Sequence, residues 1–174
     1  MNKIGLFFGP TKGSVHRVAE KIKAALGEQN VDMISVNEAA TADLEKYDRI
    51  IFGISTVGKE TWDSDNSNTD WSKFFPSISK IDYSTKTVAI FGLGDHITYS
   101  AHFVNAMGML AKELLKNGAS IVGKVDPSTY EFKASEAIFD GMFIGLPVDE
   151  DFEPEKTDLR VTNWVSEIKP AFGL

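Results

Sequence analysis

Cysteine is absent from this chain of 174 residues. Disulfide bonds, thiolate metal sites and a cysteine nucleophile are therefore excluded. Histidine is also scarce: the chain contains only His16, His96 and His102, and none of them lies in a HExxH-like spacing. We therefore do not expect a zinc enzyme.

Long apolar runs and an excess of basic residues are missing as well. No stretch approaches the roughly 20 apolar residues of a membrane-spanning helix. The apolar stretch within the opening MNKIGLFFGP is too short for a signal peptide. The net charge is −7, whereas a nucleic-acid-binding surface is basic. We expect a cytoplasmic protein that neither inserts into a membrane nor binds nucleic acid.

A single domain over residues 1–174 is expected, because no repeat, linker or low-complexity segment divides the chain. Apolar runs predict strands at 4–8, 31–36, 50–54, 87–91, 119–122 and 143–146. Apolar residues at three- and four-residue steps predict helices at 14–26, 71–78, 103–114 and 158–169. This alternation predicts an α/β fold, with a parallel sheet of five main strands covered by helices on both faces.

Three polar or glycine-rich loops follow predicted strands, at residues 9–14, 55–68 and 92–99. Ligands of parallel sheets bind beyond the carboxyl ends of the strands, so these loops predict one small-molecule site on one rim. The first loop leads into a helix start, where free backbone N–H groups and the helix dipole attract anions. An ordinary turn capped by Ser14 is the alternative interpretation of that loop.

The other two loops carry aromatic and acidic side chains. Trp62 is isolated among polar residues and either stacks on a ligand ring or folds back onto the surface. In the third loop, Gly92 and Gly94 let the backbone approach a flat ligand edge. Asp95 can accept a hydrogen bond from a ring N–H, and Tyr99 can stack on a ring.

A resemblance to the long-chain bacterial flavodoxins is carried by three stretches: FGLGDHITYSAHFVNAMGML, STYEFKASEAIFDGMFIGLPVDED and TDLRVTNWVSEIKPAFGL. It covers almost the whole chain, and residues 123–142 resemble the insertion that splits the last strand in long-chain members. The resemblance implies a flavodoxin-like three-layer sandwich with strand order 2-1-3-4-5. It also implies non-covalently bound FMN and one-electron transfer between redox partners, without enzymatic turnover.

The resemblance further implies which residues hold the cofactor. The family's phosphate loop, Thr-x-Thr-Gly-x-Thr, corresponds here to Pro10, Thr11, Lys12, Gly13, Ser14 and Val15, so only the glycine matches. The second loop corresponds to Ser55, Thr56, Val57 and Gly58, and Val57 or Trp62 takes the place of the family's inner tryptophan. A peptide flip toward the reduced flavin is expected at Gly58. Leu93, Gly94, Asp95 and Tyr99 correspond to the residues around the ring, and Asp151 to one near the ribityl chain.

From the resemblance we expect a low-potential, FMN-binding electron carrier that acts as a monomer. An acidic face around the flavin edge is expected to attract a basic reductase and acceptor. Because the threonine hydroxyls and the inner tryptophan are missing, a binding or regulatory module that has lost FMN is the alternative. A flavin reductase using NAD(P)H has less support, since no nicotinamide-binding segment is visible.

Overall fold

The computed structural model describes residues 2–56 and 70–174. Its main sheet is parallel, in the order β2-β1-β3-β4-β5, with β8 also paired to β4. The strands are β1 (Ile4–Phe8), β2 (Val31–Ser35), β3 (Arg49–Ser55), β4 (Thr87–Leu93), β5 (Ser120–Val122), β6 (Ile138–Phe139), β7 (Met142–Phe143) and β8 (Leu146–Val148). The α-helices are α1 (Ser14–Leu26), α2 (Thr41–Glu45), α3 (Asp70–Ile78), α4 (Asn105–Lys116) and α5 (Thr157–Ile168). Among these described helices, none is long and apolar enough to cross a membrane.

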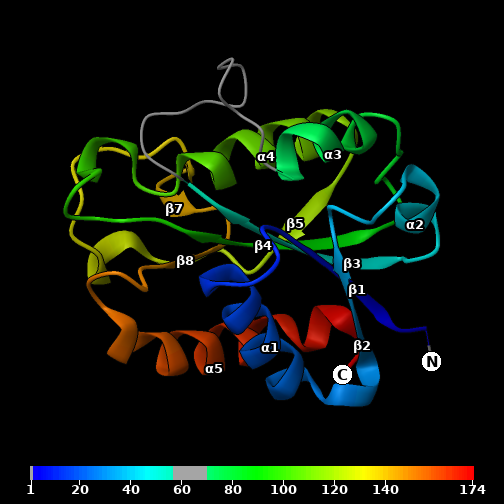
Figure 1. The fold of residues 1–174 in the computed structure, drawn as a ribbon, viewed down its shortest axis with the longest axis horizontal. Coiled ribbons are helices and arrows are strands. Elements are labelled where there is room, and N and C mark those ends of the chain that lie inside the picture. Colours follow the sequence, from blue (N-terminus) through cyan, green and yellow to red (C-terminus); the bar gives the residue numbers. More distant parts are fainter. Residues whose placement is uncertain (1, 57–69) are drawn as a thin grey trace.

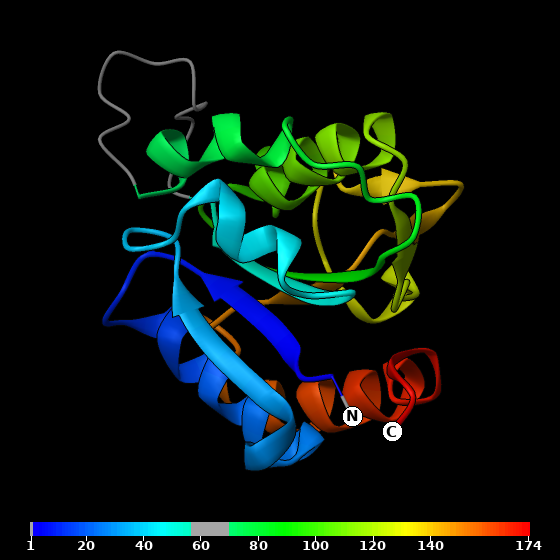
Figure 2. The same ribbon diagram turned by 90° about the vertical axis from the view of Figure 1, so that its right-hand side faces the viewer.

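The sheet separates two hydrophobic cores, as Figures 1 and 2 show. Successive strand residues point to opposite faces, so Phe7 packs in the core beneath α3 and α4, whereas Leu6 and Phe8 pack in the core beneath α1 and α5. Trp71 of α3 and Trp164 of α5 are buried in these two cores. Both faces of the sheet are therefore covered, which explains why β1, β3 and β4 are apolar over nearly their whole length.

The predicted α/β fold and the strand order implied by the resemblance are confirmed. The strand at 4–8 and the helix at 14–26 have the predicted bounds. The short helix α2 was not predicted, because its five residues bury only Leu44 and so produce no periodic pattern. The helix predicted from residue 103 begins at Asn105, since Val104 has a left-handed φ of 48°.

The strand predicted at 143–146 is wrong in its bounds. Met142–Phe143 pairs with Ile138–Phe139 in a small antiparallel hairpin, and the strand of the main sheet is Leu146–Val148. Gly145 lies between them against the carbonyl of Ile90, where no side chain would fit. One apolar run is thus divided between two sheets, a division that hydrophobicity alone does not reveal.

The insertion predicted at 123–142 splits the last strand of the sheet. β5 pairs with Thr87–Ala89 in the first half of β4, and β8 pairs with Phe91–Leu93 in the second half. The segment between β5 and β8 packs against α4, where Gly108 is in close contact with the backbone of Glu136. The insertion therefore returns the chain to β4 so that β8 ends on the same rim as β4.

Gly108→Ala tests this contact. Alanine normally stabilises a helix interior by about 1 kcal/mol relative to glycine, but here its methyl group would collide with the carbonyl of Glu136. We expect the free energy of unfolding, measured by urea denaturation, to fall by about 1 to 3 kcal/mol. Thr162→Ala on the exposed side of α5 is the control and should leave stability unchanged or raise it. A stabilised Gly108→Ala protein would contradict the close packing of the insertion on α4.

Candidate functional site

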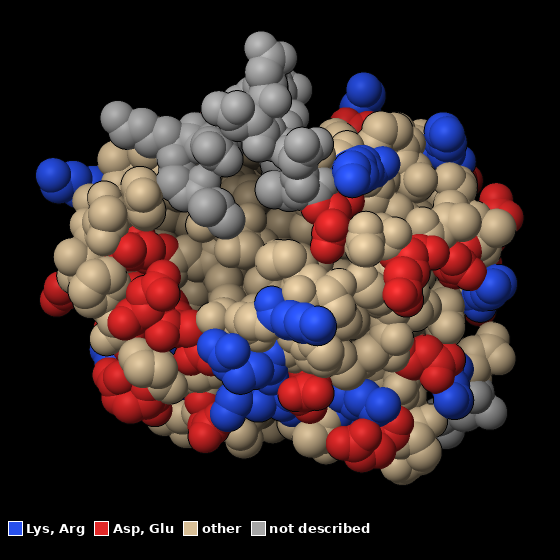
Figure 3. All heavy atoms as spheres, viewed as in Figure 1, with Lys and Arg blue, Asp and Glu red and all other residues tan. Residues whose placement is uncertain are grey.

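A cleft of about 300 Å³ lies beyond the carboxyl ends of β1, β3, β4 and β8, where the hollow in Figure 3 is seen. Its lining residues come from four separate loops, and they are Pro10, Lys12, Gly13, Ser14, Val15, Ser55, Thr56, Leu93, Gly94, Asp95, Tyr99, Glu150 and Asp151. All but Glu150 were predicted as site residues. Of the other predicted residues, Thr11 is absent from this lining, and Val57, Gly58 and Trp62 lie outside the described residues.

The start of α1 forms one end of the cleft. Gly13 occupies the N-cap position with a φ of 126°, no side chain caps the helix, and the first turn contains no acidic residue. Within the described chain, no group accepts a hydrogen bond from the amides of residues 12–16. The alternative of a turn capped by Ser14 is therefore wrong, because Ser14 is the first helical residue. Uncapped amides and the helix dipole make this end of the cleft suited to an anion.

The two hydroxyl groups of this loop have different partners. Thr11 Oγ1 lies 2.7 Å from Ser35 Oγ, at the end of β2, which explains why Thr11 does not line the cleft. Ser14 does line the cleft, and its Oγ accepts a hydrogen bond of 2.9 Å from Arg17 Nη2. Only one of the two hydroxyls is thus placed to face a ligand.

Thr56 connects the end of β3 to the end of β4 and to the start of α4. Its backbone N–H donates to the carbonyl of Leu93 at 2.9 Å, and its Oγ1 accepts from the backbone N–H of Ala106 at 3.0 Å. Ala106 lies in the first turn of α4, so the threonine hydroxyl supplies an acceptor that the helix itself lacks. The ends of β3 and β4 and the start of α4 are therefore held in one arrangement.

The carboxylate of Asp95 stabilises the third loop from within. Asp95 Oδ1 accepts hydrogen bonds from the backbone N–H groups of Ile97 at 2.9 Å and Thr98 at 2.7 Å. Gly94 donates to the carbonyl of Val148 at 3.0 Å, and a Cβ at Gly94 would lie 2.9 Å from the backbone nitrogen of Val104. The backbone of this loop consequently forms a wall of the cleft without a side chain at Gly94.

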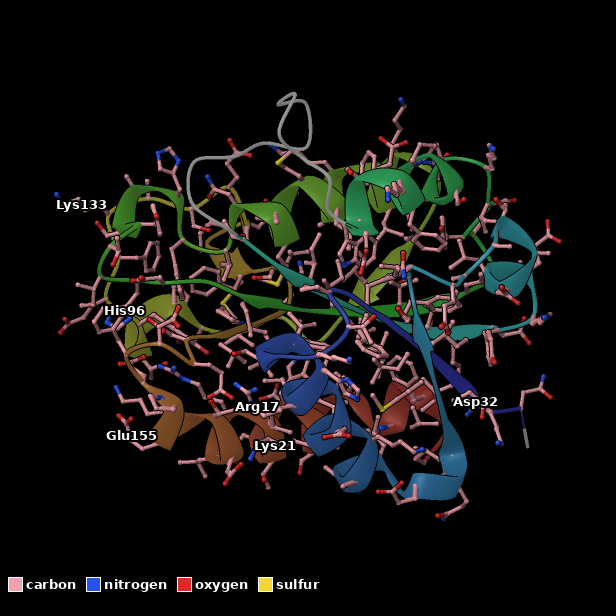
Figure 4. All side chains as sticks on the ribbon, viewed as in Figure 1. Arg17, Lys21, Asp32, His96, Lys133 and Glu155 are labelled. Carbon is pink, nitrogen blue, oxygen red and sulfur yellow. The ribbon has the colours of Figure 1, made fainter. Side chains whose placement is uncertain are left out.

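A buried carboxylate, Asp149, connects the third loop to the loop that follows β8. Asp149 is fully buried, and it accepts from the ring Nδ1 of His96 and from the backbone N–H groups of His96, Asp151 and Phe152. Figure 4 labels His96 on the left, at the rim of the sheet where β4 and β8 end. Burial raises the pKa of Asp149, but these hydrogen bonds outweigh burial and hold the pKa below its usual value.

This pair was not identified from the sequence. The run PVDED contains three consecutive acidic residues, Asp149, Glu150 and Asp151, and only the structure distinguishes the buried one from the two that line the cleft. The lone His96 in a polar loop was the available signal, since a histidine on a buried rim requires a partner.

The two ends of the cleft carry opposite charge. Asp95, Glu150 and Asp151 line the end near β8, and Lys12 lines the end near α1. In Figure 3, acidic side chains gather to the left of the hollow and basic side chains gather below it, over α1. Burial, together with the negative charges of Asp149, Asp95 and Glu150, raises the pKa of the Asp151 carboxyl. The cleft therefore offers an anion site at one end and a negative potential at the other.

Comparisons with family models, with known sequences and with solved structures all match flavodoxins. A family model described as flavodoxin matches residues 6–164. Flavodoxin of Synechocystis sp. is 39% identical, with 98% of both chains covered, and flavodoxin of Haemophilus influenzae is 37% identical, covering 95% of this chain and 92% of its own. Among solved structures, Fusobacterium nucleatum flavodoxin bound to flavin mononucleotide has a TM-score of 0.88 at 23% identity, with 98% of this chain and 99% of the other covered.

Asp149→Asn tests the buried carboxylate. The asparagine cannot accept hydrogen bonds from all four donors, and its amide would face N–H groups, so we expect the free energy of unfolding at pH 7 to fall by about 1 to 3 kcal/mol. Because the carboxyl pKa is lower in the folded chain, its stabilisation is complete above the unfolded value of about 3.9 and is lost as the pH falls below it. The difference between wild type and variant, measured by urea denaturation, should therefore be larger at about pH 5 than at about pH 3.

The control for this substitution is Asp126→Asn. Asp126 Oδ1 accepts from the backbone N–H of Ser128 at 2.8 Å, but this carboxylate is exposed on the surface. Its replacement should change the stability much less at either pH. Equal effects of the two substitutions would contradict a special role for the buried carboxylate.

Proposed function

The chain belongs to the flavodoxin family, and on this basis we propose that it carries single electrons on non-covalently bound FMN between redox proteins. It is an electron carrier and not an enzyme. The observation that carries the proposal is the cleft, which combines an uncapped helix start at one end with a glycine-containing wall and Tyr99 at the other. When bound, the flavin ring supplies the one-electron chemistry, and the protein supplies binding and electrostatics.

The anion end of the cleft fits the phosphate of FMN. The amides of residues 12–16 have no acceptor in the described chain, and Ser14 adds a hydroxyl. Lys12 lines the same end, with a left-handed φ of 66°, and its ammonium can add a charge-assisted contact. These donors take the place of the threonine hydroxyls that the loop lacks. They favour FMN binding over the alternative of a module that has lost the cofactor.

The opposite end of the cleft fits the ring. Leu93 and Gly94 provide a backbone edge, Tyr99 provides an aromatic face, and Thr56 lies at the base between the two loops. Asp95, Glu150 and Asp151 place negative charge beside this end. Negative charge opposes the negative charge that the ring gains on reduction, which lowers the reduction potential.

The acidic residues also suit a partner-binding face. We assign this face to Asp95, Glu150, Asp151 and Glu155, which lie in the loops at the acidic end of the cleft or directly after it. A basic reductase or acceptor would be attracted to this face and would approach the exposed ring edge. We propose that the protein does so as a cytoplasmic monomer.

Titration with FMN tests the proposed function. Purified protein freed of ligand should bind one FMN per chain, with quenching of flavin fluorescence, and should then accept and return single electrons in a reductive titration. Protein as isolated should show the visible absorption of a bound flavin. A colourless protein that leaves the fluorescence of added FMN unchanged would contradict the proposal and support the module without cofactor.

Ionic strength tests the acidic face. Electron transfer to a basic acceptor such as a cytochrome c should slow as ionic strength rises from about 0.05 to 0.3 M, because the screening length falls below about 10 Å. Neutralising the face with Glu150→Gln and Asp151→Asn should flatten this dependence. Glu45→Gln on α2, an exposed carboxylate outside the loops of the cleft, is the control and should keep the wild-type dependence. A second-order rate that is independent of salt in the wild type would contradict electrostatic attraction.

A further inference from the structure

Arg17 lies at the start of α1, one turn beyond Ser14, with its side chain exposed. Its Nη2 donates to Ser14 Oγ at 2.9 Å. In the part of the chain that the structure describes, Arg17 forms no ion pair with a carboxylate, whereas Lys21, one turn further along α1, pairs with Asp158. Figure 4 labels both side chains on α1. Within the described residues, no carboxylate therefore competes with a bound anion for the guanidinium of Arg17.

The hydrogen bond from Arg17 determines what the Ser14 hydroxyl can do. A guanidinium group only donates, so Ser14 Oγ must act as the acceptor in this contact. The hydroxyl proton is then directed elsewhere, and Ser14 lines the cleft. Without Arg17, the hydroxyl would lose the one hydrogen bond that it forms within the described residues, and its proton would no longer be oriented. Arg17 thus prepares Ser14 to donate to an oxygen of a bound anion.

We propose that Arg17 is a positioning residue that makes this site selective for flavins with a phosphate group. It acts by orienting the Ser14 hydroxyl and by adding positive charge at the end of the cleft formed by the start of α1. The proposal rests on the proposed function and names the residue pair by which the chain distinguishes FMN from riboflavin. Riboflavin has the same ring but no phosphate, so it gains nothing from either effect.

The opposite charges at the two ends of the cleft also decide which end a phosphate occupies. Asp95, Glu150 and Asp151 line the other end, where a phosphate dianion would be repelled. An anion is therefore stabilised at the end formed by α1, where Arg17, Lys12 and the helix dipole have the same sign. The phosphate group consequently sets the direction in which the ligand lies in the cleft.

The test compares the affinities for FMN and riboflavin in Arg17→Met, Ser14→Ala, the double variant and Lys21→Met. Lys21→Met is the matched control, because it removes the same charge from the same helix one turn further from the cleft. We expect Arg17→Met to weaken FMN binding about 5- to 30-fold, in line with one charge-assisted contact of about 1 to 2 kcal/mol. Riboflavin binding should change less than about twofold, as should the binding of both ligands to Lys21→Met.

Two further measurements distinguish a positioning role of Arg17 from a general effect of its charge. If Arg17 acts through Ser14, the double variant should lose clearly less affinity than the product of the two single losses. FMN binding by Arg17→Met should also depend less on salt than FMN binding by the wild type. Circular dichroism should show unchanged helix content, since the replaced side chain is exposed.

Several outcomes would overturn the inference. Equal effects of Arg17→Met and Lys21→Met on FMN would show only a long-range charge effect. Equal weakening of FMN and riboflavin would show damage to the cleft as a whole. Independent effects of the Arg17 and Ser14 substitutions would remove the positioning role. In each of these cases the wild type still binds FMN and the proposed function stands, whereas a wild type that binds neither flavin would overturn both.

Discussion

Strand β4 is the structural element on which the cleft depends. It pairs along its whole length with β3 on one side, and on the other side first with β5 and then with β8. In a parallel sheet all these strands end on the same rim. The pairing of β4 therefore brings together the loop after β3, the loop after β4 and the acidic loop after β8, although the last lies more than 50 residues further along the chain. The insertion between β5 and β8 serves this arrangement, since it returns the chain to the open half of β4.

A buried charge then links two of these loops. A carboxylate removed from water is tolerated only when its oxygens receive hydrogen bonds, and the donors to Asp149 come from His96 before it and from Asp151 and Phe152 after it. If the two loops moved apart, the buried carboxylate would lose both donors from His96 and would keep only those of its own loop. The walls that carry Asp95 and Asp151 are thus joined to each other through one buried carboxylate.

Periodicity in the sequence was sufficient for the strands and for the long helices, because burial on both faces of the sheet requires apolar strands. Periodicity was not sufficient for β8, because the apolar run before the acidic loop contributes one strand to the small hairpin and another to the main sheet. Three of the loops that line the cleft were predictable because loops after parallel strands converge, and the resemblance supplied the individual residues, including Asp151 in the fourth loop. The hydrogen bonds that orient them were not predictable: those of Thr11 to Ser35, Thr56 to α4 and His96 to Asp149 join residues that lie far apart in the chain.

The arrangement of charge in the cleft follows from the helix that begins there and from the strands that end there. The end of the cleft at α1 is positive because a helix begins there without a cap and without an acidic first turn. The other end is negative because strands end there in loops that carry carboxylates. A ligand that has a phosphate at one end and a ring at the other meets both requirements at once. In the proposed function, the positive end binds the phosphate of FMN and the negative end makes reduction of the ring less favourable, so affinity and potential depend on different residues.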